Sequence, residues 1–237
     1  MSGFGEDAKV LAMRRRKETE PKAQANALFD DLSLGDSPLR TETVVVPAED
    51  SLELILADLR GSHACGVCKP GMPIVFGMGQ SPAELMLIGE GPGIDDIPSQ
   101  LPFQGQSGIL LTKMMAAINV GWGASGDCYT CNVIKCVPPG ERNFSVAEIE
   151  DCRPLLLRQI LVVRPRVIIA FGALAAQTLL RSKKTISDLR GRSYSLWLNE
   201  HEMAVVPTFN PAYLLRVAEK KREAWEDLKL VRQLLQA

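Results

Sequence analysis

Residues 84–93 read ELMLIGEGPG, an apolar run that leads directly into a glycine-rich turn. Its apolar residues follow one another without alternation, which is typical of a strand that is buried on both faces of a parallel sheet. Four runs of this kind predict the central strands of the fold. They are Glu84–Gly89, Tyr129–Ile134, Val167–Phe171 and Met203–Thr208.

Segments with helical periodicity separate and follow these runs. They are Ser51–Arg60, Ser107–Ile118, Ser145–Val162, Ala173–Leu180 and Pro211–Leu235. Strands that alternate with helices predict an α/β fold, here a three-layer α/β/α sandwich with a four-stranded, mostly parallel sheet. Residues 1–45 are polar and lack periodicity, so we expect a flexible N-terminal tail before one folded domain at residues 46–237.

The composition is that of a globular protein, because 46% of the 237 residues are apolar and 23% are charged. The longest apolar stretch, Ile160–Ala176, is interrupted by two arginines and a proline, so it does not predict a membrane span. The N-terminal residues MSGFGEDAKV lack the apolar core of a signal peptide. We therefore expect a cytoplasmic protein with no membrane partner.

The charges are unevenly distributed, although the net charge of the chain is only −1. Residues 81–110 contain four acidic residues and no basic one, whereas residues 181–222 contain nine basic and four acidic residues. An acidic cluster and a basic surface in one domain would suit a polyanionic substrate on which carboxylates perform the chemistry.

The candidate site follows from the predicted sheet. In such sheets ligands bind outside the carboxyl ends of the parallel strands. These ends carry Glu90 in a glycine-rich turn, Asn132, Gly172 and Phe209-Asn210-Pro211. The turn is not a dinucleotide-binding fingerprint, because Ile94 replaces the last glycine of that motif and no helix follows directly.

Six cysteines indicate a metal site of one of two kinds. Cys65 and Cys68 form a C-x-x-C pair in a loop, and Cys136 and Cys152 could complete a set of four thiolates. Both zinc and an iron–sulfur cluster accept four thiolates. The wide spacing of the last two cysteines favours the cluster and leaves zinc as the alternative, whereas Cys128 and Cys131 fit buried apolar positions.

Four motifs in order give the chain a family likeness. They are the cysteine set, the GEGPG turn followed by Pro102-Phe103-Gln104-Gly105, the segment from Asn132 to Pro139, and the segment from Asn210 to Arg216. With these motifs the chain resembles the iron–sulfur uracil-DNA glycosylases, the family 4-like branch of the uracil-DNA glycosylase superfamily. The likeness spans about residues 51–222.

The resemblance implies an enzyme of base excision repair that flips uracil out of DNA and hydrolyses its N-glycosidic bond. It implies a structural 4Fe–4S cluster on Cys65, Cys68, Cys136 and Cys152. It also implies a substrate pocket formed by Gly91, by Phe103 stacked on the uracil ring and by Asn132 at its polar edge. Glu90 and Asp96 would be the acids nearest the sugar. We expect a monomer whose partner is DNA containing uracil or another deaminated base.

The catalytic residues expected are Asp96, Glu90 and Asn210. A carboxylate near the anomeric carbon stabilises the sugar cation and positions water, and we favour Asp96 over Glu90 for the water. Neither His63 nor His201 is well placed to act as the base. The family usually has histidine where this chain has Asn210, which can donate a hydrogen bond but cannot become cationic.

The DNA-binding residues expected are Arg142, Arg192, Leu214 and Arg216, with Leu214 as an apolar wedge in the space that the flipped base leaves. Further candidate phosphate contacts are Lys135, Arg190, Lys220, Lys221 and Arg222. Two alternatives to the enzyme stay open, namely a non-catalytic or weakly catalytic binder of damaged or abasic DNA and a zinc-bound structural module.

Overall fold

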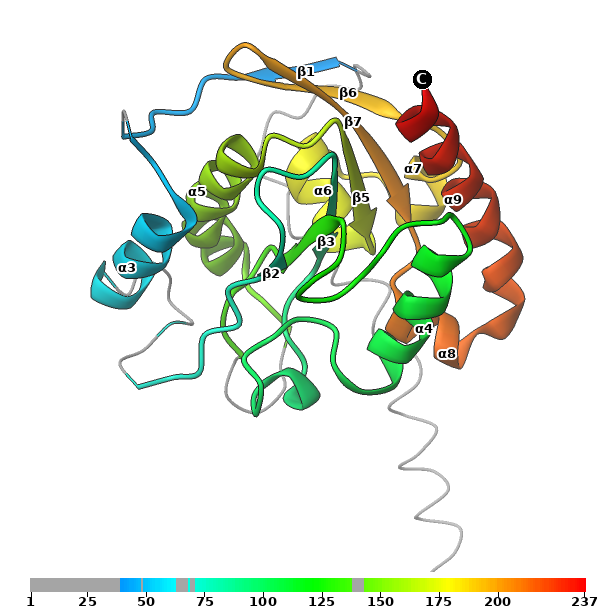
Figure 1. Cartoon of the computed structure of the whole chain (residues 1–237), viewed down its shortest axis with the longest axis horizontal. Helices are drawn as coiled ribbons and strands as arrows, with labels where there is room; N and C mark the ends of the chain where they lie inside the picture. The colour runs from blue at the N-terminus through cyan, green and yellow to red at the C-terminus, as the bar shows by residue number, and fades with distance from the viewer. Residues whose placement is uncertain (1–38, 48, 63–67, 69–70, 138–142) are drawn as a thin grey trace, which may run out of the picture.

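The computed structural model describes residues 39–47, 49–62, 68, 71–137 and 143–237, and Figure 1 shows a central sheet between two groups of helices. The described residues form a seven-stranded sheet in the order β1-β6-β7-β5-β3-β4-β2. Its strands are β1 (Leu39–Glu42), β2 (Met78–Gly79), β3 (Leu85–Gly89), β4 (Cys128–Asn132), β5 (Val167–Phe171), β6 (Tyr194–Leu198) and β7 (His201–Thr208).

The four predicted strands form the parallel centre of this sheet. Strand β3 pairs in parallel with both β4 and β5, and β5 pairs in parallel with β7. Every residue of β3, β4 and β5 is buried, which explains why β3 and β5 lack polar side chains, while β4 contains the buried polar residues Thr130 and Asn132.

The predicted number of four strands is wrong, because β1, β2 and β6 extend the sheet at its two edges. Strand β2 is two residues long, and β6 alternates between buried and half-buried positions. Strands β2 and β6 pair antiparallel with β4 and β7, so the sheet is mixed outside its centre. Such short or half-exposed edge strands lack the buried apolar run on which the prediction rested.

Helices cover both faces of the sheet. They are α3 (Leu52–Ser62), α4 (Gly105–Ala116), α5 (Val146–Val163), α6 (Ala173–Leu180), α7 (Ile186–Leu189), α8 (Pro211–Arg216) and α9 (Lys221–Gln236), with short 3-10 turns η1 (Ile94–Asp96) and η3 (Ala218–Lys220). One apolar core contains residues of α3, α5 and α6, and a second contains residues of α4, α8 and α9. The described residues therefore form three layers, as predicted (Figure 1).

The single helix predicted for Pro211–Leu235 is wrong, because the chain breaks it at Val217. This residue has φ −127° and ψ 79°, outside the helical region, and separates α8 from η3 and α9. The break lets α8 pack beside α4 while α9 turns back along β5 and β7. Apolar periodicity alone does not reveal such a change of direction.

Helix α5 begins where the sequence predicts it. The Ser145 N–H donates to Glu148 Oε2 over 2.8 Å, and the Glu148 N–H donates to Ser145 Oγ over 3.3 Å, which forms a capping box. The helix ends at Arg164 in the left-handed conformation. Its orientation places Cys152 and Gln159 in the protein interior.

The predicted tail, residues 1–45, overlaps the described part of the chain at β1. Residues 39–42 pair in parallel with β6, whereas residues 1–38 lie outside the described residues. The boundary near residue 45 therefore stays a prediction. None of the helices in the described part of the chain has the length and apolar character needed to cross a membrane.

Candidate active site

The residues expected in the site gather at the carboxyl ends of the four parallel strands, which lie on one side of the sheet. Across the sheet from β7 to β4, this edge carries Asn210, Gly172, Glu90 and Asn132. Residues from four separate segments therefore converge at the position where open α/β sheets bind ligands.

Gly89, the last residue of β3, lies between the two side chains expected to hold the base. A Cβ atom built on Gly89 would overlap Asn132 Oδ1 and would lie 2.6 Å from Phe103 Cζ. Phe103 and Asn132 thus meet over a residue without a side chain. The sequence separates them by 29 positions, but the structure brings both side chains to Gly89.

Phe103 is held in place by its backbone and by a second aromatic ring. Its φ angle is 57°, in the left-handed region that a bulky residue seldom adopts. Its ring packs edge-on against Phe171, with centroids 5.8 Å apart, and only 7% of the residue is exposed. Backbone strain of this kind is common where a side chain is aimed at a ligand.

Asn132 presents a hydrogen-bond donor without a partner among the described residues. The residue is 2% exposed, and its Nδ2 atom has no hydrogen-bond partner among the described residues. Buried amide groups are nearly always paired, because an unpaired one loses its hydration without compensation. The donor therefore indicates a ligand with a hydrogen-bond acceptor.

The carboxylate of Glu90 lies at the N-terminus of α6. The Leu174 N–H donates to Glu90 Oε1 over 2.9 Å, and Asn210 Nδ2 donates to Oε2 over 3.3 Å. A Cβ atom on Gly172 would lie 2.5 Å from the Glu90 Cδ atom, so this glycine provides the space for the carboxylate. Burial raises the pKa of Glu90, while these donors and the charge of Arg216 act in the opposite direction.

Asp96, the acid favoured by sequence for positioning water, is tied to the loop that contains it. Its Oδ2 accepts the Gly93 N–H over 3.0 Å and its Oδ1 accepts the Gln104 N–H over 2.7 Å. The residue is 5% exposed, and burial raises the pKa of Asp96 against the effect of these backbone donors. Asp96 thereby joins the turn after β3 to the segment that carries Phe103.

Gly91 lies on another side of the same turn. A Cβ atom at this position would overlap the ring of Phe144 and would approach Ile134 Cβ to 3.5 Å. The absence of a side chain at Gly91 therefore allows the turn to pack on Phe144, and these contacts differ from the Phe103–Asn132 contacts of Gly89.

Asn210 begins α8 and fulfils two roles at once. Its Oδ1 accepts the Ala212 N–H over 3.0 Å as a helix cap, while its Nδ2 donates to Glu90. The amide of this expected catalytic residue is thus engaged with the Glu90 carboxylate.

The expectation that Leu214 forms an exposed wedge is wrong. Leu214 is 1% exposed and belongs to the core between α4 and α9, whereas its neighbour Leu215 is 44% exposed. Successive residues of a helix point about 100° apart, so a shift of one position exchanges a core side chain for a surface one.

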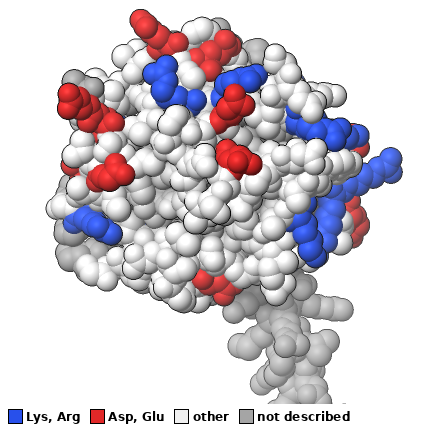
Figure 2. Space-filling view, in the orientation of Figure 1, with Lys and Arg blue, Asp and Glu red and all other residues white. Residues whose placement is uncertain are grey.

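The basic candidates separate into exposed and buried groups. Arg192 and Arg216 are exposed, and Figure 2 shows Lys and Arg side chains gathered over α8 and α9. Arg142 lies outside the described residues. Two candidate phosphate contacts are excluded by their environment, because Lys135 is fully buried and Arg190 forms an ion pair with the buried Asp227.

The described cysteines of the expected metal set are all buried. Cys68 and Cys136 are joined as a disulfide with Cα atoms 5.8 Å apart, and Cys152 belongs to the same apolar core. Cys65 lies outside the described residues. The fold thus brings two cysteines 68 positions apart into one buried, apolar region.

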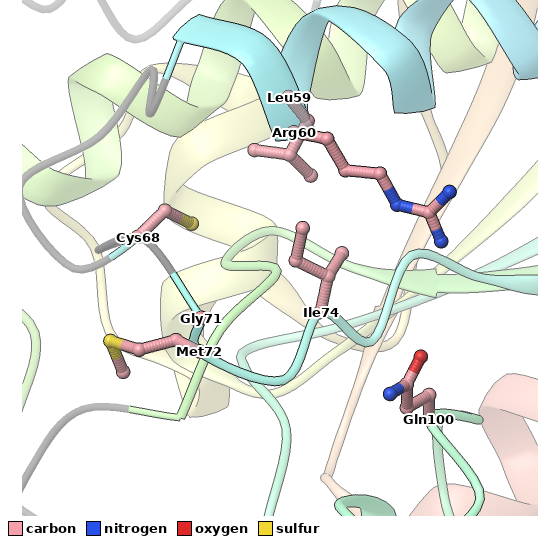
Figure 3. Close-up of a pocket in the computed structure, with 7 residues that line it drawn as sticks. All are labelled: Leu59, Arg60, Cys68, Gly71, Met72, Ile74 and Gln100. Carbon is pink, nitrogen blue, oxygen red and sulfur yellow. The ribbon is translucent and has the colours of Figure 1, made fainter.

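A pocket of about 210 Å³ opens beside Cys68. Figure 3 shows that Arg60 of α3 and Gln100 of the loop after β3 lie on opposite sides of it. Neither Phe103 nor Asn132 lines this pocket. It therefore adjoins the cysteines and is separate from the expected base site.

The sequence places two glycines at the strand ends of the site but does not predict which side chains fill the space beside them. Gly89 and Gly172 each end a parallel strand and each leave room for a polar side chain from another segment, Asn132 and Glu90 respectively. The only signal in the sequence is a glycine after an apolar run, which tight turns also show.

Comparison with known proteins agrees with this geometry. Residues 76–229, more than half of the chain, match the family model described as "Uracil DNA glycosylase superfamily". The chain belongs to the uracil-DNA glycosylase superfamily.

Within this superfamily the chain is similar to three type-4 uracil-DNA glycosylases. It is 32% identical to the one from Archaeoglobus fulgidus over 189 residues, which cover 78% of this chain and 94% of the relative. It is 34% identical to that from Thermotoga maritima over 184 residues, 76% of this chain and 93% of the relative. It is also 34% identical to that from Saccharolobus solfataricus over 191 residues, 78% and 87% of the two chains. The family 4-like resemblance seen in the motifs is therefore confirmed.

Proposed function

We propose that this superfamily member excises uracil from DNA by hydrolysing the N-glycosidic bond of a nucleotide flipped out of the helix. The observation that carries the proposal is the buried, unpartnered Nδ2 of Asn132 next to the ring of Phe103. A nucleobase needs both an aromatic surface and hydrogen bonds to its polar edge to leave the stack. The similarity to type-4 uracil-DNA glycosylases supports uracil as the base that is bound and released.

Base binding assigns Phe103 and Asn132 their separate roles. Phe103 stacks on the flipped ring and offsets part of the unstacking cost of a few kcal/mol. Asn132 Nδ2 donates to a carbonyl oxygen of uracil. This bond strengthens as the base departs, because the electron pair of the glycosidic bond moves onto the base.

For the carboxylate that faces the sugar, we favour Glu90 over Asp96. The Glu90 carboxylate stands at the edge where the strands end, beside Asn210 and the positive charge of Arg216. The Asp96 carboxylate holds two backbone N–H groups of its own loop. In the reaction, ionised Glu90 stabilises the sugar cation and orients water, whose oxygen bonds to the anomeric carbon while a proton ends on the base.

Asn210 acts mainly through Glu90. By donating to Oε2 it favours the ionised form of the carboxylate and fixes its direction. Because asparagine replaces the usual histidine here, we also propose that the protein accepts deaminated bases other than uracil, which the range of substrates tests.

On the DNA side, Arg192 and Arg216 bind phosphates, and Leu215 replaces Leu214 as the apolar side chain that enters the space left by the base. Leu215 is exposed on α8, five positions after Asn210, which caps the start of this helix. Cationic side chains around one apolar residue suit a duplex that is opened at a single position.

We also propose that Cys65, Cys68, Cys136 and Cys152 hold a 4Fe–4S cluster. The described three are buried among apolar residues and come from the loop after α3, the segment that follows β4, and α5, a donor set that fits four-thiolate ligation. A Cys68–Cys136 disulfide and a cluster exclude one another at these two sulfurs. When bound, the cluster would serve as a structural cross-link between these segments.

The experiment is base release by the purified protein from oligonucleotides that contain one uracil, with thymine at the same position as control. Single-stranded and duplex forms, and duplexes with hypoxanthine or xanthine, define the range. We expect release of uracil and none of thymine. Binding to abasic DNA without any base release would instead support the non-catalytic binder, for which the engagement of Asn210 by Glu90 is the favouring observation.

A further inference from the structure

An open groove lies between α4 and the helices α8 and α9, which Figure 1 shows beside α4. Its volume is about 220 Å³, and most of the residues that line it are apolar. Helix α4 contributes Leu110 and Met114, and α9 contributes Trp225 and Leu228. The two side chains proposed to bind the flipped base do not line this groove, so it is separate from that site.

The groove has a buried floor and half-exposed walls. Leu214 and Leu228 are 1% and 2% exposed and form the floor, whereas Leu110 and Trp225 are half-buried. An aromatic ring and an aliphatic side chain are therefore partly open to solvent within one groove. Contiguous apolar surface of this kind often marks a binding site.

Two lysines line the groove together with these apolar residues. Lys113 stands in the last turn of α4 and Lys221 begins α9, and both are exposed. No ion pair joins either of them to a carboxylate of the described residues, whereas the neighbouring Lys220 is paired with Glu223. The positive charge on both walls favours an anionic occupant.

The groove adjoins the surface that we propose for DNA binding. Leu214 of its floor directly precedes the exposed Leu215 and Arg216 on α8. Arg222, the residue after Lys221, is exposed as well. Figure 2 shows Lys and Arg side chains over these same helices, α8 and α9. The apolar groove is thus continuous with a cationic face that already has DNA as its proposed partner.

Single-stranded DNA has the chemistry that this groove requires. Proteins that bind single strands combine cationic side chains, which contact phosphates, with aromatic side chains on which unpaired bases stack. A base within a duplex is paired and stacked, so only an unpaired base can enter such a groove. An acidic peptide would also suit the two lysines, but continuity with Leu215 and Arg216 favours DNA.

We propose that the groove between α4 and α9 is a subsite for an unpaired base of single-stranded DNA that flanks the uracil. Trp225 is the surface on which this base stacks, and Lys113 and Lys221 contact the adjacent phosphates. The inference rests on the proposed function, because it takes DNA as the substrate. It adds a second place where the protein holds a base, apart from the pocket for the flipped one.

The test compares two single strands that have the same phosphates. Both carry thymine in place of uracil, so no base is released, and in one of them the nucleotides on either side of the thymine are abasic. For Trp225→Ala we expect the affinity for the strand with all its bases to fall by about 10-fold, and the affinity for the abasic strand to stay unchanged. Equal losses on the two strands, or no loss, would overturn the proposal and leave a peptide as the occupant.

The lysines are tested through the salt dependence of binding. Lys113→Gln and Lys221→Gln should weaken both strands alike, and each should reduce the slope of log affinity against log salt by about 0.7. Arg60→Gln is the charge control, because Arg60 is exposed on α3, which belongs to the other apolar core. A slope that changes no more in the lysine variants than in Arg60→Gln would contradict the phosphate contacts.

A second pair of variants keeps the test decisive if Trp225→Ala does not fold. Ala117 is exposed and lines the groove, whereas Ala116 is exposed beside it and does not. Ala117→Glu places a charged side chain in the groove and should weaken binding of the strand with all its bases by about 10-fold. Ala116→Glu makes the same change of charge outside the groove and should weaken it by about 2-fold at most. Equal effects of the two variants would refute the subsite.

Uracil release by the unmodified protein tests the proposed function separately. Release of uracil without any preference for the base-containing strand would refute the subsite and leave the enzyme intact. Base-dependent binding without release would support the subsite and refute only the enzyme.

Discussion

Asn210 and Glu90 are hydrogen-bonded across 120 positions of the chain, with Asn210 Nδ2 donating to Glu90 Oε2 over 3.3 Å. The bond joins the end of β7 to the end of β3 and spans β5, which lies between them in the sheet. It couples the least typical residue of the site to the carboxylate that we propose for catalysis.

This bond predicts a shift in the pH dependence of base release. Only ionised Glu90 can stabilise the sugar cation, so activity falls as the pH falls through its pKa, which burial places above the ordinary 4.5. Asn210→Ala removes a donor that lowers this pKa, so the acidic limb of the profile should move to higher pH. Glu90→Gln should abolish the limb and slow release by about 100-fold or more.

The measurement is single-turnover uracil release over a range of pH. Glu84→Gln provides the control, because Glu84 is exposed next to the opposite end of β3. An acidic limb that stays in place in Asn210→Ala would contradict the coupling, and retention of full activity in Glu90→Gln would contradict the role of this carboxylate.

Gly89 should tolerate no side chain. The Cβ atom of Gly89→Ala would overlap Asn132 Oδ1 and would lie 2.6 Å from Phe103 Cζ, so both base-binding side chains must move. Displacement by about 1 Å can cost about 100-fold in rate, and we expect a loss of that size. Gly93→Ala is the matched control, because nothing lies within 4 Å of its Cβ position; equal activity of the two variants would show that the pocket is elsewhere.

Asn132→Leu should separate stability from activity. Leucine has a similar shape and removes a buried donor without a partner, so the free energy of unfolding should stay unchanged or rise by about 1 kcal/mol. Uracil release should fall by about 100-fold or more, because the donor proposed to bind the polar edge of the base is lost. Denaturant unfolding measures the expected stability, and base release measures the expected loss of activity. A clear loss of stability would mean that the amide has a structural partner.

Leu214 and Leu215 should behave in opposite ways. Leu214→Ala leaves a cavity in the core and should reduce the free energy of unfolding by about 2–5 kcal/mol. Leu215→Ala should leave stability unchanged and slow uracil release from duplex DNA more than from single strands, because only a duplex leaves a stacked gap to fill. Thermal unfolding of both variants tests the difference in stability, and uracil release from duplex and single-stranded DNA tests the wedge. An equal effect of Leu215→Ala on the two substrates would exclude Leu215 as a wedge.

The cysteine assignment predicts a coloured protein. Purified without oxygen, it should show absorption near ~400 nm and about four iron atoms per chain. Cys152→Ser should lose both, whereas Cys128→Ser should keep them, since Cys128 is a buried cysteine outside the set. A colourless protein that contains zinc, or one with a stable Cys68–Cys136 disulfide and no metal, would overturn the cluster.

The sequence predicted which residues belong to the candidate site better than it predicted what each of them does. Phe103 and Asn132 stand in motifs of the family, and the structure places them together over Gly89. Asp96 and Glu90 are indistinguishable as acids after the same strand. Only their hydrogen bonds distinguish them. Asp96 accepts a backbone N–H of its own loop, whereas Glu90 accepts one from the start of α6, at the carboxyl ends of the strands.

The sequence by itself determined the parallel centre of the sheet, because a strand covered on both faces is apolar at most of its positions. It also determined the family, since ordered motifs require no knowledge of contacts. Tertiary structure alone decided that Leu214 is core and Leu215 is surface, that Lys135 is buried under Asn132, and that Asn210 reaches Glu90. Local periodicity reports which face of an element is buried, whereas strand order and helix direction decide which distant side chains meet, and those depend on packing of the whole chain.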